Sequence, residues 1–227
     1  MASPPGTGVL IVWVDLDPAL SEVADRWYER EHLPERITDA GYLTAQRFRS
    51  TSGAPEYMAV FEASTPDALA SDGYKRITQS ISPLSQRVRN GFRRCIRSTH
   101  VVVNSFGQAS GGAVLCSRLR MREPQQVQRF TEWAREGFAD WARSQPAVLS
   151  GRALAPIPEV RAKMDSFRAT GQSDEWVDAV VLLEFGRADV AETRKGLVDR
   201  DGLSGQGIEA QQVDVGVYQF LVGFSAR

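Results

Sequence analysis

Apolar and polar positions in this chain define a series of strands and helices whose order occurs twice. An almost unbroken apolar run at 9–16 predicts a strand that is covered on both faces. The three-and-four spacing of apolar residues over 18–36 predicts an amphipathic helix that ends at Pro34. A strand pair, a second helix and a fourth strand complete the first unit. These strands are expected at 42–50, 56–63 and 95–103, and the second helix opens at 65–67.

The same order returns in the second half of the chain. Its strands are expected at 113–119, 147–155, 176–185 and 212–224, and its helices at 123–144 and 188–198. The segment 105–112 is rich in Gly, Ser, Asn and Gln and predicts a connector. The polar stretch 156–173 is interpreted as a rim loop and the Gly-rich stretch 199–207 as a connecting loop. The predicted repeats are therefore residues 8–104 and 112–225.

Alignment of the repeats predicts that only the first carries chemistry. Matching 42–47 with 148–153 places Phe138 opposite His32 and Ala134 opposite Tyr28. Two such units give a pair of antiparallel four-stranded sheets with helices on their outer faces. Packing or closing the sheets into a barrel would remove exposed edges and create an internal pocket. One site per chain follows, with the second repeat supplying wall residues such as Phe138.

Composition narrows the classes of partner. The 227 residues carry 27 basic and 28 acidic side chains, and no Lys/Arg cluster suits a nucleic-acid backbone. No apolar run reaches the roughly 18 residues of a membrane span, so we expect a cytoplasmic protein with a small-molecule substrate. Cys95 and Cys116 lie in apolar runs without CxxC spacing and are interpreted as buried thiols in a reducing compartment. Two histidines without a carboxylate or cysteine cluster predict no metal site.

His32 is the leading catalytic candidate. It and His100 are the only histidines, and it lies where the first helix is expected to end, a position that favours the protonated ring. Tyr28 lies one helical turn earlier on nearly the same face, so both side chains can address one ligand as proton carrier and oxygen stabiliser. The alternative is a surface or capping histidine that bonds a carbonyl group.

Glu31 is the third catalytic candidate. It continues the apolar stripe that contains Trp27, so its carboxylate would face inward. Burial would raise the pKa of Glu31 and suit it to shuttle a proton or to orient His32. A frayed helix end would instead expose it to water or to an arginine, while Glu29 and Glu35 fall on the solvated side.

Aromatic and basic residues suggest a cavity for a planar apolar molecule, although most of them would also serve as core. Arg47 can pair with a substrate carboxylate, or be a solvated charge on an exterior face. His100 shares a strand face with apolar residues and either lines the pocket or is a hydrogen-bonded core residue. The candidate substrate-binding residues are Trp13, Trp27, Arg47, Tyr74, His100 and Phe138.

Residues 9–74 resemble the EthD-like branch of the dimeric α/β-barrel (ferredoxin-like) proteins. The resemblance rests on Trp-Tyr-x3-His-Leu-Pro, Gly-Tyr-Leu-x3-Arg-Phe and Pro-Glu-Tyr-Met-Ala-Val-Phe-Glu. It implies an α+β fold of two ferredoxin-like repeats that form an intramolecular dimeric α/β-barrel arrangement. Because one chain provides both halves, a monomer or a homodimer would be functional.

The resemblance implies several activities, since members of that superfamily include cofactor-free cyclases, decarboxylases, isomerases, quinol monooxygenases and heme-dependent enzymes. The first interpretation is a cofactor-independent lyase or cyclase acting on a small aromatic or polyketide-like substrate by decarboxylation, dehydration or cyclisation. The second is a cofactor-free or heme-dependent oxygenase. The third is a non-catalytic ligand-binding accessory protein.

Overall fold

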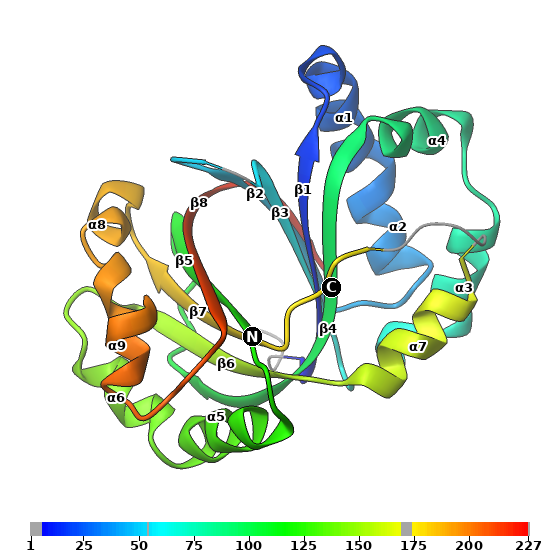
Figure 1. The fold of residues 1–227 in the computed structure, drawn as a ribbon. Helices are drawn as coiled ribbons and strands as arrows, with labels where there is room; N and C mark the ends of the chain where they lie inside the picture. Colours follow the sequence, from blue (N-terminus) through cyan, green and yellow to red (C-terminus); the bar gives the residue numbers. More distant parts are fainter. Residues whose placement is uncertain (1–5, 54, 169–173, 227) are drawn as a thin grey trace.

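The strands of the computed structural model, which describes residues 6–53, 55–168 and 174–226, close into an antiparallel barrel (Figure 1). Around the barrel the order is β1-β3-β2-β8-β5-β7-β6-β4. The bounds are β1 Gly8–Leu16, β2 Thr44–Ser50, β3 Tyr57–Ala63, β4 Phe92–Phe106, β5 Ala113–Arg120, β6 Ser150–Pro156, β7 Ala179–Phe185 and β8 Gln212–Ser225. Each of these strands pairs on both sides, so none of them presents an open edge.

The barrel consists of two units with the same internal strand order. The first runs β4-β1-β3-β2 and the second runs β8-β5-β7-β6. The two are joined where β2 pairs with β8 and where β4 pairs with β6. This arrangement confirms the predicted fold class, an α+β chain whose ferredoxin-like repeats form the barrel within one molecule.

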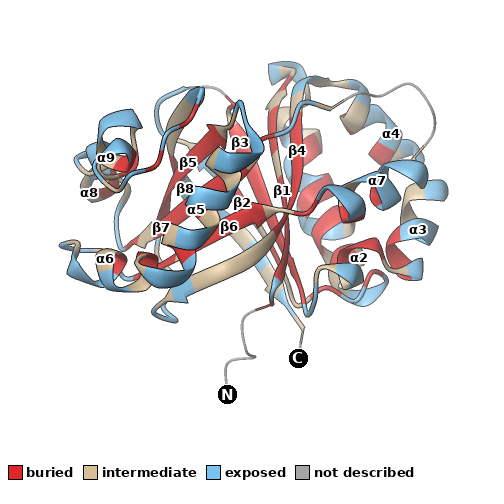
Figure 2. Ribbon diagram, turned by 60° about the horizontal axis from the view of Figure 1, so that its bottom comes forward, coloured by how far each residue is buried: buried red, intermediate tan, exposed pale blue. Residues whose placement is uncertain are grey.

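Helices cover the outer faces of the barrel (Figures 1 and 2). Helices α1 to α4 lie over the first repeat, and α5, α6, α8 and α9 lie over the second. The bounds are α1 Ser21–Trp27, α2 Leu33–Thr38, α3 Asp72–Gln79, α4 Pro83–Asn90, α5 Pro124–Glu136, α6 Phe138–Ser144, α7 Pro158–Ser166, α8 Ala188–Glu192 and α9 Arg200–Ser204. A π-helical turn spans Tyr28–His32, and 3-10 turns span Pro18–Leu20, Asp67–Ala70 and Lys195–Leu197. Among the described residues, no helix combines the length and the apolar character needed to cross a bilayer.

Two segments interpreted as loops contain helices. The stretch 156–173 includes α7, which leaves the second repeat and packs beside α3 of the first (Figure 1). Val160 and Met164 lie one turn apart on α7 and are buried in the core of the first repeat, which gives this polar helix its apolar face. The stretch 199–207 includes α9, whose first turn is capped by the Asp199 side chain accepting from the Gly202 amide.

The interior of the barrel is filled. Inward-facing residues of both repeats, including Val9, Ile11, Trp13 and Met58, form one buried cluster. Arg152 of β6 forms an ion pair across the interior with Glu62 of β3. The expected pocket inside the barrel is therefore wrong, because side chains occupy that space.

Candidate active site

A π-helical turn places His32 in the middle of a helical segment rather than at its end. The Leu33 amide donates to the Tyr28 carbonyl, five residues back, and α2 then continues to Thr38. Pro34 is tolerated there because it lies in the first turn of α2, where a missing N–H leaves no bond unmade. The predicted helix end at Pro34 is therefore wrong. Such turns are common at functional sites.

A cavity of about 380 Å³ lies between the outer face of the first sheet and the helices that cover it. Strands β1, β3 and β4 supply its apolar floor, which includes Leu10, Val12 and Phe61. The first helical segment supplies Trp27, Tyr28, His32 and Arg36, and α3 supplies Tyr74. The structure thus brings together four of the candidate residues in one cavity, Trp27, Tyr28, His32 and Tyr74.

The imidazole of His32 is packed among aromatic rings. It stacks on Trp27 with 4.1 Å between ring centroids and meets the edges of Tyr28 and Phe61 at 5.3 Å and 5.8 Å. Burial, reinforced by the neighbouring guanidinium of Arg36, holds the pKa of His32 well below its usual value. The ring is neutral at pH 7, contrary to the protonated form expected at a helix C-terminus.

Glu35 fixes the orientation of this ring. Its Oε1 lies 3.1 Å from Nδ1 of His32. With the Nδ1–H donating to the carboxylate, Nε2 holds the lone pair and is the nitrogen that can accept a proton. Burial raises the pKa of Glu35. Glu35 was expected on the solvated side, but it contacts His32 instead; in a helix that continues past Pro34, its i,i+3 spacing from His32 would have identified it.

Arg47 supports Tyr28 from outside the cavity lining. Its guanidinium lies over the rings of Tyr28 and Tyr57 at 4.1 Å and 4.5 Å, and Nη1 is 2.6 Å from Asp25. Burial raises the pKa of Tyr28 to about 12, so its hydroxyl keeps its proton. Arg47 is thus neither a solvated charge nor part of the cavity surface, and the structure gives it a packing partner rather than a position for a substrate carboxylate.

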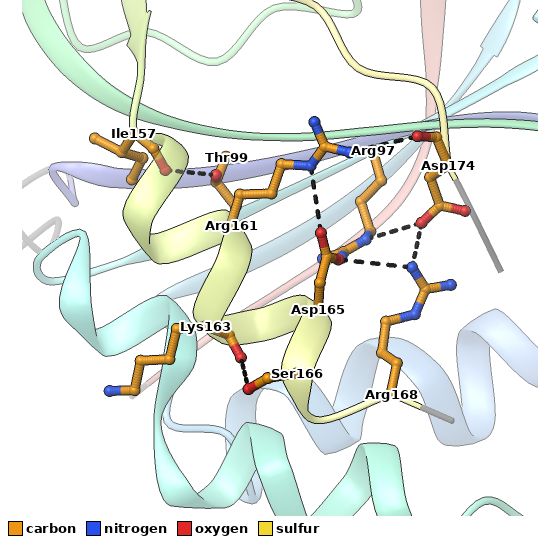
Figure 3. A network of polar contacts seen from close by, with 9 residues as sticks. All are labelled: Arg97, Thr99, Ile157, Arg161, Lys163, Asp165, Ser166, Arg168 and Asp174. Carbon is orange, nitrogen blue, oxygen red and sulfur yellow. Dashed lines mark hydrogen bonds and ion pairs between the residues drawn. The ribbon is translucent and has the colours of Figure 1, made fainter. Parts of the chain in front are cut away.

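Five arginines among the lining residues form a cationic wall of the cavity. They are Arg36, Arg89, Arg93, Arg97 and Arg168. Figure 3 shows Arg97 and Arg168 converging on Asp165, which lies on α7, and on Asp174, which follows α7 in the chain. The second repeat therefore contributes to the site through an insertion that the sequence analysis interpreted as a rim loop.

The remaining candidates lie elsewhere. Trp13 belongs to the barrel interior, and His100 is fully buried, with its pKa lowered to about 3 by burial. Phe138 is in the core of the second repeat, so the predicted wall contribution of this residue is wrong. Glu31 accepts a hydrogen bond from the Ser82 hydroxyl and is not among the described residues that line the cavity.

Comparison with known proteins identifies the fold. No family model matches the chain, and no curated protein matches its sequence. An anthrone oxidase-like protein superposes with a TM-score of 0.62 and 13% identity over 99% of this chain and 95% of the other. A putative monooxygenase from Lactobacillus acidophilus NCFM gives a TM-score of 0.59 and 9% identity over 96% of each chain. A chlorite dismutase from Candidatus Nitrospira defluvii gives 0.50 and 10% over 97% and 92%.

These similarities extend over the whole chain and show that it has the dimeric α/β-barrel fold in tandem form. At such identities they establish the fold alone. The finer resemblance to the EthD-like branch stays a prediction.

Proposed function

We propose that this protein is a cofactor-independent oxygenase of a planar phenolic substrate, and that His32 is the base that begins the reaction. The observation that carries the proposal is a neutral, buried imidazole held by a carboxylate in an aromatic cavity. A base must be unprotonated before it can remove a proton, and burial provides that state at pH 7. The aromatic rings of Trp27 and Phe61 suit a flat substrate.

The reaction needs only proton transfer and dioxygen. Nε2 of His32 takes a proton from an activated methylene carbon between two aromatic rings, and the resulting carbanion gives one electron to dioxygen. The substrate radical and superoxide combine in a C–O bond, and the imidazolium returns its proton to the outer oxygen. Loss of water breaks the O–O bond and removes the second hydrogen from carbon. In total, the methylene and one dioxygen become a ketone and one water.

Neighbouring side chains assist these steps. The Glu35 carboxylate stabilises the imidazolium that forms when His32 accepts a proton, as the acidic member of a catalytic triad does. Tyr28, which keeps its proton, is the donor available to a developing phenolate oxygen. The apolar floor excludes water from the carbanion.

The lyase or cyclase interpretation also assigns proton transfer to His32. What favours the oxygenase is that two proteins of the same fold are described as an anthrone oxidase-like protein and a putative monooxygenase. The cavity chemistry fits both classes, so the products of turnover decide between them.

Turnover of 1,8-dihydroxyanthrone under ¹⁸O₂ tests the proposal. We expect an anthraquinone with one labelled oxygen, and loss of the enzymatic rate above autoxidation in His32→Gln. His100→Gln is the matched control, because it changes a buried histidine outside the cavity. Loss of water or carbon dioxide from an aromatic acid under nitrogen would establish the lyase instead. Binding without turnover, unchanged in His32→Gln, would establish the accessory protein.

A heme-dependent oxygenase is the second candidate, and the His32–Glu35 pair favours it. Histidine ligands commonly donate their other N–H to a carboxylate, so Nε2 of His32 would be the nitrogen that holds the iron, and the arginines of the cavity would pair with the porphyrin carboxylates. Bound heme would supply dioxygen activation. Titration with hemin distinguishes the two candidates: a stoichiometric Soret band that is lost in His32→Gln supports heme, and free hemin absorbance alone supports the cofactor-free reaction.

A further inference from the structure

The arginines of the cavity wall differ in how far their charges are balanced. Three of them have carboxylate partners close by. The pairs are Arg97 with Asp165 and Asp174, Arg168 with Asp174, and Arg93 with Asp17. The other two, Arg36 and Arg89, have no comparable pairing within the described part of the chain. Unbalanced positive charge in a cavity attracts an anion.

Arg36 is the more unusual of the two. It is only 4% exposed, and its Nε and Nη1 atoms have no hydrogen-bond partner among the described residues. Its only ion pair with a described residue is a long one, 3.7 Å from Nη2 to Oε1 of Glu35, an oxygen that also bonds His32. The guanidinium lies 5.0 Å above the ring of Tyr74. Buried donors without partners are costly, so a cavity lined by them favours a ligand that accepts hydrogen bonds.

Arg89 reinforces this charge from α4. It lines the cavity and forms no ion pair with any described residue. Burial, and then the charge of Arg36, lowers the pKa of Arg89, which places the two guanidiniums within electrostatic reach of each other. Two like charges in one cavity repel unless an anion separates them.

We infer that the substrate is an aromatic anion whose carboxylate binds Arg36 and Arg89 while its ring lies on the apolar floor of the cavity. Calling the anion a substrate rests on the proposed function, whereas binding of the anion to Arg36 and Arg89 is independent of it. A guanidinium presents planar N–H donors that suit a carboxylate, and Nε and Nη1 of Arg36 are donors without a partner among the described residues. The bound anion also offsets the arginine charges that disfavour protonation of His32. A negatively charged substrate would therefore make His32 a stronger base.

Matched probes test the inference without turnover. Anthraquinone-2-carboxylate and its primary amide share one ring system and differ in charge. Isothermal titration at pH 7.5 and fixed ionic strength should give at least tenfold tighter binding of the carboxylate. In Arg36→Gln and in Arg89→Gln this preference should fall to threefold or less, with the amide affinity unchanged. Arg36→Lys should keep part of the preference, because it retains the charge and loses the planar donor pair.

Arg49→Gln is the control, because Arg49 is 59% exposed, pairs with Glu56 and does not line the cavity. It should leave the preference intact. Equal binding of both probes by the wild type, or an equal loss in Arg49→Gln, would overturn the inference. If Arg36→Gln proves unfolded by circular dichroism, Arg89→Gln decides. Carboxylate-selective binding without oxygen uptake would refute the proposed function alone, whereas His32-dependent oxidation of a neutral anthrone without carboxylate preference would refute this inference alone.

Discussion

The two repeats build the same layers and differ in what lies between sheet and helix. In the first repeat a cavity occupies that space, with His32 and Tyr28 at its surface. In the second, Phe130, Ala134 and Phe138 occupy it as fully buried core residues. Phe138 lies against Gly151 of β6, where an added Cβ would come within 3.2 Å of its ring. The second repeat thus shows how this fold packs when it has no ligand to accommodate.

The difference begins in the backbone of the first helical segment. In the first repeat a π turn at Tyr28–His32 joins α1 to α2, whereas in the second Gly137 separates α5 from α6. The alignment that pairs His32 with Phe138 also pairs Glu35 with Trp141 and Arg36 with Ala142. The polar residues of the first helical segment at this site, His32, Glu35 and Arg36, therefore have apolar counterparts in the second repeat. The apolar packing of the second repeat stabilises the chain and offsets the cost of the buried polar groups in the first repeat.

Substitution at the two aligned positions, His32 and Phe138, should affect turnover very differently. His32→Gln removes the proposed base and should lower the turnover of 1,8-dihydroxyanthrone by about 10²- to 10⁴-fold, the usual contribution of a general base. Phe138→His should create no second activity, because Phe138 is packed among apolar residues in the core of the second repeat. Initial rates corrected for autoxidation measure both. A residual rate above a tenth of wild type in His32→Gln would remove His32 from the chemistry.

Most of the fold was predictable because its signals are local. The bounds predicted for the strands at 9–16, 56–63 and 113–119 agree with β1, β3 and β5 to within two residues, since each is a short apolar run between turn signals. Pairing of the repeats into a closed barrel followed from their duplication. The helix α7 was missed because its apolar face is only Val160 and Met164, and these pack on the other repeat. Helix α7 is therefore stabilised by contacts with the first repeat and has no clear amphipathic pattern of its own.

The site was predictable only in part. Tyr28 and His32 were found because a four-residue spacing keeps two side chains adjacent in an α turn and in the π turn that replaced it. Glu35 was missed because Pro34 normally ends a helix, and nothing local announces a π turn that makes it acceptable. Arg36 and Arg89 were missed for another reason. They line one cavity from α2 and α4, two helices far apart in sequence, and a single arginine on a helix is normally interpreted as solvated.

Removal of the Phe138 ring should lower stability without affecting turnover. Phe138→Ala leaves a void beneath α6 and should lower the free energy of unfolding by about 3–5 kcal/mol, as large-to-small core changes do. Turnover measured well below the melting temperature should stay within a factor of two, because Phe138 does not line the cavity. Urea denaturation measures the first effect. A parallel fall in kcat would show that the repeats are coupled more closely than the filled barrel implies.

The two histidines should give the protein a measurable loss of stability in acid. An unfolded chain protonates His100 near pH 6.5, whereas burial keeps the folded residue neutral to about pH 3. The unfolded state binds more protons in that window, so stability is highest above pH 6.5 and falls as the pH drops, by up to about 1.4 kcal/mol per unit. His100→Leu should flatten the slope between pH 6.5 and 4.5, measured by urea denaturation. An unchanged slope would mean that His100 titrates normally in the fold.

His32 contributes to the same slope for a different reason, and this sharpens the comparison between cavity and core. Its lowered pKa depends on burial and on the arginine wall, so a bound aromatic carboxylate should raise it. With anthraquinone-2-carboxylate present, the pH slope of the His100→Leu variant should therefore decrease further. The amide probe is the control and should leave that slope as it was.

The smallest effect is expected where a buried cation has an exposed partner. Arg47, aligned with the buried Ala153 of the second repeat, is 2% exposed, while its partner Asp25 is 53% exposed. Water screens such a carboxylate, and the rings of Tyr28 and Tyr57 still hold the guanidinium, so Asp25→Asn should cost less than about 1 kcal/mol of unfolding free energy. Arg47→Ala should cost more, because it also leaves a gap beside Tyr28. Equal losses in the two variants would mean that the ion pair, and not the stacking on the tyrosines, keeps Arg47 inside the first repeat.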